Sequence, residues 1–361
     1  MRLAILAGME PALDLLLSGR ALESREAVKL GIVDEIPPPD VALVRARAWL
    51  ATEPSSVKLW DRKDWVPPQR QGLTAPELSA RYSEAKSALA TKSCNLPAPP
   101  AILCTVVEGL QLPFDEALSV ESKYFALLLT DPVARNIIRT TFISKHAAEK
   151  GARRPQGIPR SSVTKLGVLG AGMMGAGIAY VAAAAGIDVV LLDREQAMAE
   201  KGKGYTTKVQ DGLIKRGRLD AARAGKVLSR ITPTTDFSKL ADCELGIEAV
   251  FEDTAIKGDV IRRTEAVVSS KTLLASNTST LPISRLAEAT TRPDQFIGLH
   301  FFSPVDRMGL VEVILGQETS SETLARGLDF VAQLRKTPIV VNDSRGFYTS
   351  RVFQTLIHEG A

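Results

Sequence analysis

A run of 22 residues without a charge, residues 166–187, constrains the fold of this chain more than any other feature. The run is long enough to cross a bilayer as a helix. It contains six glycines, however, and four of them lie within the ten residues LGVLGAGMMG. Glycines at this density mark a turn rather than a membrane helix. A short strand, a glycine turn and a buried helix therefore explain the run better than a transmembrane segment does.

The turn in this run has the spacing of a dinucleotide-binding loop. A strand over residues 165–169 is followed by Gly170, Gly172 and Gly175, and the helix AGIAYVAAAAG comes next. In such loops the first glycine allows the tight turn, and the second lets backbone amides approach a pyrophosphate. The third allows the helix to pack closely against the strand.

An acidic residue at the end of the next strand identifies the expected cofactor. The strand over residues 188–192 ends at Asp193, which lies 23 residues after Gly170. A carboxylate there accepts hydrogen bonds from the adenosine ribose hydroxyls and repels a 2′-phosphate. We therefore expect NAD rather than NADP, even with Arg194 beside it. The alternative is a structural turn with an incidental aspartate.

Short apolar runs alternate with helical stretches from Lys165 onward, which is typical of a parallel sheet with helices on both faces. The predicted fold is a doubly wound α/β (Rossmann) domain. Seven runs are expected to be strands: KLGVLG, DVVLLD, CELGIEAV, TLLASN, FIGLHFF, VEVIL and TPIVVND.

Composition excludes several classes of protein. The net charge of +4 and the aromatic content of 5% argue against a nucleic-acid partner. The three cysteines are too scattered for a disulfide framework or a metal site, and they favour a reducing compartment. Acidic residues interrupt the apolar N-terminus too early for a signal peptide. A cytoplasmic protein without a transmembrane segment is expected.

The part before Lys165 is predicted to be mainly helical. One short strand is expected at Ile32-Val33, after a helix that ends near Gly31. Residues 54–100 are irregular and rich in proline, and apolar helical patterns follow them. The basic connector over residues 150–165, KGARRPQGIPRSSVTK, is expected to be a solvated linker rather than a phosphate-binding patch.

His300 and Glu312 are the candidates for proton transfer. His300 lies at the carboxyl end of an apolar run, where doubly wound folds place their ligands. An imidazole can take the proton of a hydroxyl while hydride leaves the same carbon. A carboxylate on its other nitrogen would orient the ring and stabilise the imidazolium. Without further context, one histidine and one glutamate could equally be core and surface residues.

The full set of motifs resembles the 3-hydroxyacyl-CoA dehydrogenase family. GAGMMG, the distant Asp193, IEAVFED, ASNTSTLPI, GLHFFSPV and LVEVI occur in the family order between Lys165 and about Arg351. The resemblance implies oxidation of a (S)-3-hydroxyacyl-CoA to the 3-ketoacyl-CoA with reduction of NAD. It also implies that His300 is the general base, Glu312 its partner and Ser279 a catalytic hydrogen-bonding residue.

The resemblance also assigns binding residues. Ser279 and Ser350 would contact the acyl-CoA substrate. Ser303 and Ser350 stand where many members of the family have asparagine, which has a longer side chain. The expected cofactor-binding residues are Gly170, Gly172, Met174, Gly175, Asp193, Val250, Phe251, Glu252, Lys257, Ser279 and Ser303.

The front third resembles the closing segment of an enoyl-CoA hydratase (crotonase-type) domain, followed by the linker helix of multifunctional fatty-acid oxidation complex alpha subunits. The hydratase glutamates and oxyanion hole would precede Arg2-Leu3, so hydratase (lyase) activity is not expected from this chain. A fragment of a longer enzyme is expected, with a thiolase subunit or a second copy as partner in the full-length protein. The expected parts are a hydratase remnant (1–110), a linker helix region (111–162), an NAD-binding domain (163–342) and the start of a truncated helical domain (343–361).

The sequence leaves one alternative function open and argues against another. A non-catalytic NAD-binding or interaction module is the alternative, because the helical domain that supplies substrate contacts is incomplete. A sugar-nucleotide dehydrogenase would need a cysteine nucleophile late in the chain, and the last cysteine is Cys243. The retention of His300, Glu312 and Ser279 favours the enzyme.

Overall fold

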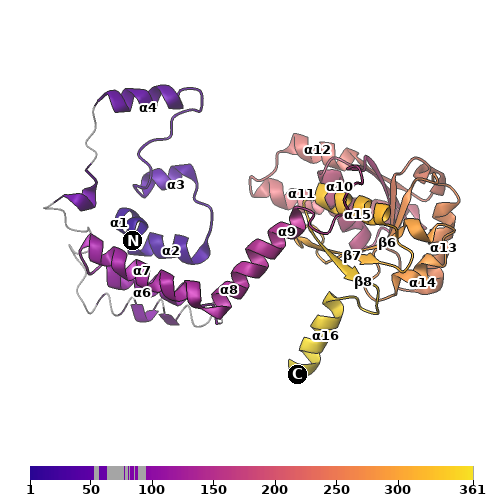
Figure 1. Ribbon diagram of the computed structural model, residues 1–361. Coiled ribbons are helices and arrows are strands. Elements are labelled where there is room, and N and C mark those ends of the chain that lie inside the picture. Colours follow the sequence, from indigo (N-terminus) through magenta and orange to yellow (C-terminus); the bar gives the residue numbers. More distant parts are fainter. Residues whose placement is uncertain are drawn as a thin grey trace. The chain divides into compact units, whose positions relative to one another are not determined.

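The computed structural model describes residues 1–52, 57–62 and 95–360, and between them positions 77, 80, 82–84, 86 and 87. These residues form two compact units, Met1–Ile143 and Ser144–Ala361. Each unit is described by itself (Figure 1).

The first unit is helical in its described part. Its core packs α1 and α2 against α6, with Ala4, Ile5, Met9, Leu103 and Val106 at the centre. The elements are α1 (Arg2–Ala7), α2 (Met9–Ser18), α3 (Ser24–Lys29), α4 (Ala42–Ala51), η1 (Leu59–Asp61), α6 (Ala98–Gly109), α7 (Phe114–Thr130) and α8 (Pro132–Ile138), and the π-helical turn η3 (Arg139–Ser144) follows.

The strand expected at Ile32-Val33 is wrong. The backbone N–H groups of Ile32 and Val33 both donate to the carbonyl of Ala27, at 3.0 and 3.4 Å. These residues therefore close the end of α3 in a turn and do not extend into a strand. The proline-rich stretch after residue 54 lies largely outside the described residues.

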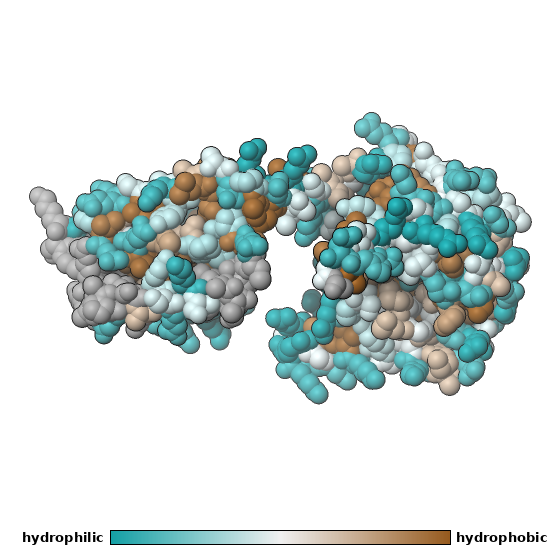
Figure 2. Space-filling view, turned by 90° about the horizontal axis from the view of Figure 1, so that it is seen from below, coloured by the Kyte–Doolittle hydropathy of each residue, from teal (hydrophilic) through white to brown (hydrophobic). Residues whose placement is uncertain are grey.

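Large apolar side chains remain exposed on this unit. Figure 2 shows hydrophobic residues gathered on its surface. On α4, which has no buried residue, Leu43, Val44, Trp49 and Leu50 are each at least 60% exposed. On α7, Phe125 is exposed to a similar extent. Soluble proteins rarely expose large apolar side chains in contiguous patches.

The second unit is built on one eight-stranded sheet with the order β3-β2-β1-β4-β5-β6-β7-β8. Neighbouring strands are parallel except for β6 and β7, which are antiparallel. The chain order reverses between β1 and β4, which is where doubly wound folds bind their ligands. The strands are β1 (Lys165–Leu169), β2 (Asp188–Leu192), β3 (Ile231–Thr234), β4 (Leu245–Glu248), β5 (Leu273–Ser276), β6 (Phe296–Phe301), β7 (Leu310–Leu315) and β8 (Thr337–Asn342).

Helices cover both faces of this sheet, as the doubly wound prediction requires. Alternate residues of a strand point to opposite faces, and accordingly Val168 joins the core with α10 and α15 while Leu169 joins a second core cluster. A third cluster packs α13 and α14 against Phe296 and Ile314. The helical elements are α9 (Lys145–Glu149), α10 (Met173–Ala184), α11 (Gln196–Lys215), α12 (Ala221–Ser229), η4 (Phe237–Leu240), α13 (Thr254–Glu265), α14 (Ile283–Ala287), η5 (Pro293–Gln295), α15 (Ser321–Gln333) and α16 (Thr349–Gly360).

Two features of the sheet differ from the expectation. The seven predicted strands are all present, but β3 is an eighth; its four residues ITPT contain a proline, which is tolerated because β3 is an edge strand. The second difference is the antiparallel pair. Only residues 302–309 separate β6 from β7, and a parallel connection needs a dozen residues or more. The chain therefore turns back, which places His300 directly opposite Glu312.

The basic connector is not simply solvated. The side chain of Arg154 is 9% exposed, and its guanidinium donates to Asp329 of α15 at 2.7 and 3.0 Å. Arg160 donates to the same carboxylate at 3.0 Å, as do the backbone N–H and the hydroxyl of Ser161. The expectation of a solvated linker is wrong for Arg154, which the Asp329 carboxylate fixes to α15. Arg160 contacts the same carboxylate, but its side chain is 67% exposed, as expected for the linker.

Within the described part of the chain, no helix combines the length and the apolar character that a membrane span requires. The uncharged run over residues 166–187 is divided between β1, the glycine turn and the 12-residue helix α10.

The glycine turn gives a direct test of this packing. A Cβ atom at Gly175 would lie 1.8 Å from the carbonyl oxygen of Gly170. We expect Gly175→Ala to lower the free energy of unfolding by about 3 kcal/mol or more, measured by urea denaturation. Gly204→Ala is the matched control, because it also lies within a helix but its Cβ would meet nothing within 4 Å. The control should stabilise α11 by about 0.5–1 kcal/mol, and equal effects of the two changes would contradict this packing.

Candidate active site

The turn after β1 leaves a helix N-terminus open to an anion. Gly170 has a φ of 101°, and a Cβ there would lie 2.7 Å from the carbonyl oxygen of Ala249. Gly172 is the N-cap residue of α10, and no side chain caps the helix. A Cβ at Gly172 would meet nothing within 4 Å. The first backbone N–H groups of α10 thus face open space, which suits the pyrophosphate of a dinucleotide.

Asp193 fixes this turn and lines the space beside it. Its Oδ2 accepts a hydrogen bond from the backbone N–H of Ala171 at 2.7 Å, and its Oδ1 accepts one from the N–H of Arg194 at 2.8 Å. A carboxylate has about four acceptor positions, so capacity remains for ribose hydroxyls. Gly170, Gly172, Asp193 and the segment Val250-Phe251 line a cavity of about 980 Å³, called here the glycine-loop cavity.

A second cavity of about 310 Å³ lies around His300, and we call it the histidine cavity. The carboxyl ends of β4, β5 and β6 and the start of α10 contribute to it. It brings together seven of the residues that the sequence singled out: Met174, Val250, Glu252, Lys257, Ser279, His300 and Ser303.

His300 is oriented by Glu312. The Nδ1 atom of His300 lies 2.7 Å from Oε2 of Glu312. Since a carboxylate only accepts, Nδ1 carries the proton and Nε2 is left as the acceptor. Glu312 is fully buried and also accepts hydrogen bonds from the hydroxyl and backbone N–H of Thr349 and the N–H of Tyr348. Burial pushes the pKa of Glu312 up, but the hydrogen bonds from His300 and Thr349 outweigh it and hold the pKa below its usual value.

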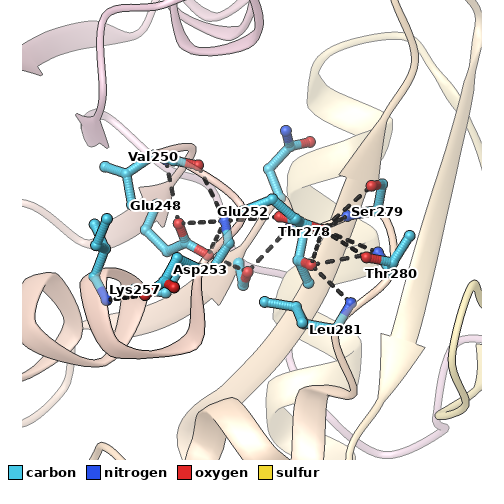
Figure 3. A network of polar contacts seen from close by, with 12 residues as sticks. Glu248, Val250, Glu252, Asp253, Lys257, Thr278, Ser279, Thr280 and Leu281 are labelled. Atoms are coloured by element: carbon cyan, nitrogen blue, oxygen red, sulfur yellow. Dashed lines mark hydrogen bonds and ion pairs between the residues drawn. The ribbon is translucent and has the colours of Figure 1, made fainter.

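Glu252 holds the loop that carries Ser279 (Figure 3). Its Oε1 accepts from the Thr278 hydroxyl at 2.6 Å, from the N–H and hydroxyl of Ser279 at 3.0 and 3.2 Å, and from the N–H and hydroxyl of Thr280 at 3.1 Å each. Burial raises the pKa of Glu252, but Thr278, the charge of Lys257 and the N–H of Ser279 together lower it to about 2.

Two further residues support the cavity and were missed in the sequence. Glu248, at the end of β4, accepts hydrogen bonds from Lys257 Nζ at 2.9 and 3.1 Å. Asn277, after β5, accepts the backbone N–H of Phe301 at 2.8 Å and lines the histidine cavity beside His300. Both lie within the motifs IEAVFED and ASNTSTLPI, where the available signal was a polar residue at the end of a buried strand or directly after one.

Ser303 lines the histidine cavity, whereas Phe251 and Ser350 do not. The Ser303 hydroxyl lies 3.7 Å from Sδ of Met173. Phe251 is 78% exposed; it lines the glycine-loop cavity and does not line the histidine cavity. Ser350 lies in the first turn of α16, next to Thr349, and does not line the histidine cavity.

Comparison with known proteins decides the family. Residues 165–344 match the family described as 3-hydroxyacyl-CoA dehydrogenase, NAD binding domain. The crystal structure of (S)-3-hydroxybutyryl-CoA dehydrogenase from Ralstonia eutropha is 38% identical, with a TM-score of 0.53, over 55% of this chain and 70% of that one. The chain belongs to the 3-hydroxyacyl-CoA dehydrogenase family.

One further relative extends the match to the first unit of the chain. The fatty acid oxidation complex subunit alpha of Psychrobacter arcticus is 34% identical over 368 residues, which takes in 98% of this chain and 50% of that protein. The 3-hydroxybutyryl-CoA dehydrogenase of Escherichia coli K12 is 32% identical with a TM-score of 0.51, over 56% of this chain and 44% of that one. The chain spans about half the length of the curated relatives it matches.

The contacts of Glu252 predict a pH dependence of stability. Its pKa is lowered from 4.5 to about 2 in the fold, so folding favours the ionised form. The contribution is complete above a pH of 4.5 and is lost as the pH falls towards about 2. We expect the difference in unfolding free energy between the natural chain and Glu252→Gln to shrink over that interval in urea titrations. A difference that stays constant on both sides of 4.5 would contradict these contacts.

Proposed function

We propose that this chain oxidises the 3-hydroxyl of a (S)-3-hydroxyacyl-CoA to a ketone with NAD. The observation that carries the proposal is the His300–Glu312 pair, with Nδ1 held at 2.7 Å and Nε2 left as an acceptor beside the histidine cavity. The family membership and the NAD-binding domain match support it.

The glycine loop fits the cofactor. The uncapped N-terminus of α10 and the open space at Gly172 suit a pyrophosphate. The Asp193 carboxylate suits an adenosine ribose without a 2′-phosphate. When bound, NAD would supply the acceptor for the hydride that leaves the substrate carbon. Glu252, Lys257, Met174 and Ser303 would line its other end.

The chain's own residues account for the proton. His300 Nε2 takes the proton of the substrate hydroxyl as the C–H bond of the same carbon gives up its hydride. The imidazolium that forms keeps its Nδ1–H on Glu312, whose negative charge stabilises it. Ser279, fixed by Glu252, is the residue we propose to hydrogen-bond the substrate oxygen.

The wider context rests on the relatives. We propose that the chain works as part of a multifunctional β-oxidation enzyme, because the alpha subunit of Psychrobacter arcticus matches both units. Five points stay predictions: the hydratase-type ancestry of the first unit, the domain bounds, Ser350 as a substrate contact, a thiolase or second-copy partner, and the cytoplasmic location.

A histidine replacement tests the mechanism. We expect His300→Ala to lower the rate of NADH consumption with acetoacetyl-CoA by about 10²- to 10⁴-fold, since the general base is lost. NADH affinity, measured by direct titration, should change little. His146→Ala is the matched control, because His146 is exposed on α9.

The same experiment separates the alternative function. A chain that binds NADH but turns over at the same negligible rate before and after the His300 change would be a non-catalytic NAD-binding module. A chain that does not bind NADH would overturn the enzyme assignment altogether.

A further inference from the structure

Glu248 is a buried carboxylate that the proposed reaction does not use. It is the last residue of β4, is 2% exposed and is paired in register with Ser276 at the end of β5. Both its oxygens contact Lys257 Nζ, the Val250 N–H donates to Oε2 at 3.3 Å, and the Ser276 hydroxyl donates to Oε1. Figure 3 shows Glu248, Glu252 and Lys257 within one network of polar contacts.

The described contacts of Glu248 are all with donors, so its carboxylate is held in the ionised form. The Lys257 ammonium and the Val250 N–H can only donate, and the Ser276 hydroxyl, which accepts the N–H of Thr278, donates its own proton to Glu248. Burial raises the pKa of Glu248, which means that the charge is costly and depends on the donors around it.

Lys257 is shared between two carboxylates. Its Nζ lies 2.9 Å from Glu248 Oε2 and 3.2 Å from Glu252 Oε2, and the side chain is 1% exposed. One ammonium against two carboxylates leaves this wall of the histidine cavity with one net negative charge. Among the described residues that line the cavity, Lys257 is the one with a permanent positive charge.

The opposite wall has the same sign. With a neutral imidazole, the His300–Glu312 pair also carries one negative charge, on Glu312. The hydride acceptor must lie within reach of the carbon whose hydroxyl contacts His300, so its ring belongs in this cavity. A ring placed there lies among negative charges that water screens incompletely.

We propose that Glu248 sets the charge preference of the histidine cavity. By engaging the Lys257 ammonium, it leaves the wall negative and favours a cationic pyridinium ring over the same ring without its charge. This inference rests on the proposed function, because the nicotinamide of NAD⁺ is such a cation and that of NADH is neutral. Glu248 does not line the cavity, and it acts through Lys257.

The test compares two dissociation constants in the full chain, without turnover. NAD⁺ and NADH are titrated separately by calorimetry into the natural protein and into Glu248→Gln. We expect the ratio of the NAD⁺ constant to the NADH constant to rise roughly three- to tenfold in the variant. Glu252→Gln removes one charge from the same wall at a more exposed position and should move the ratio in the same direction.

Glu265→Gln is the matched control. Glu265 lies on α13, the helix that carries Lys257. Its carboxylate is paired with Arg292 at 3.1 Å, and it lines neither cavity. This change should leave the ratio as it is in the natural chain. If Glu248→Gln does not fold, as judged by circular dichroism, the Glu252→Gln ratio decides alone.

The following results would overturn the inference. Both constants changing by the same factor would make Glu248 only a structural support of the site. A ratio that falls would give the charge the opposite effect. A natural chain that binds neither form would overturn the proposed function first, whereas normal binding with an unmoved ratio would overturn this inference alone.

Discussion

The antiparallel pairing of β6 and β7 is the constraint on which the site depends. A parallel pair would need a crossover of a dozen residues or more between the two strands. In the antiparallel pair, His300 and Glu312 are register partners. Backbone hydrogen bonds of the sheet therefore set the approach of imidazole and carboxylate before either side chain is oriented. The short connection over residues 302–309 produces this geometry.

Most of the second unit was accessible from the sequence because its signals are local. An apolar strand, a glycine turn and a helix each follow from neighbouring residues, and seven strands and their class were predicted correctly. The strand β3 could not be found in this way, since ITPT is short, half polar and interrupted by proline. The strand expected at Ile32-Val33 is absent because the carbonyl of Ala27 accepts hydrogen bonds from both N–H groups. Arg154 appeared solvated because its partner, Asp329, lies 175 residues away.

The site residues also differ in whether a local sequence signal identifies them. Glycine spacing and the position of Asp193 indicate a dinucleotide from general chemistry, and the structure places both at one cavity. General chemistry made Glu312 a candidate partner of His300, and the family resemblance selected it. The roles of Glu252 and Lys257 came only from the family resemblance, since no periodicity relates them to His300. Glu248 and Asn277 escaped because a polar residue at a strand end has many uses, and only the folded sheet shows that each is satisfied by a specific partner.

The contacts of Glu312 extend beyond the sheet. Besides His300, the carboxylate binds the backbone of Tyr348 and Thr349, which is the point where α16 begins, and α16 buries none of its own residues. The anchor of this helix and the orienting bond of the histidine are thus the same carboxylate. A swing of α16 about its first turn would pull on Glu312 and tilt the imidazole. The position of α16 and the orientation of the His300 imidazole are therefore coupled through the hydrogen bonds of Glu312.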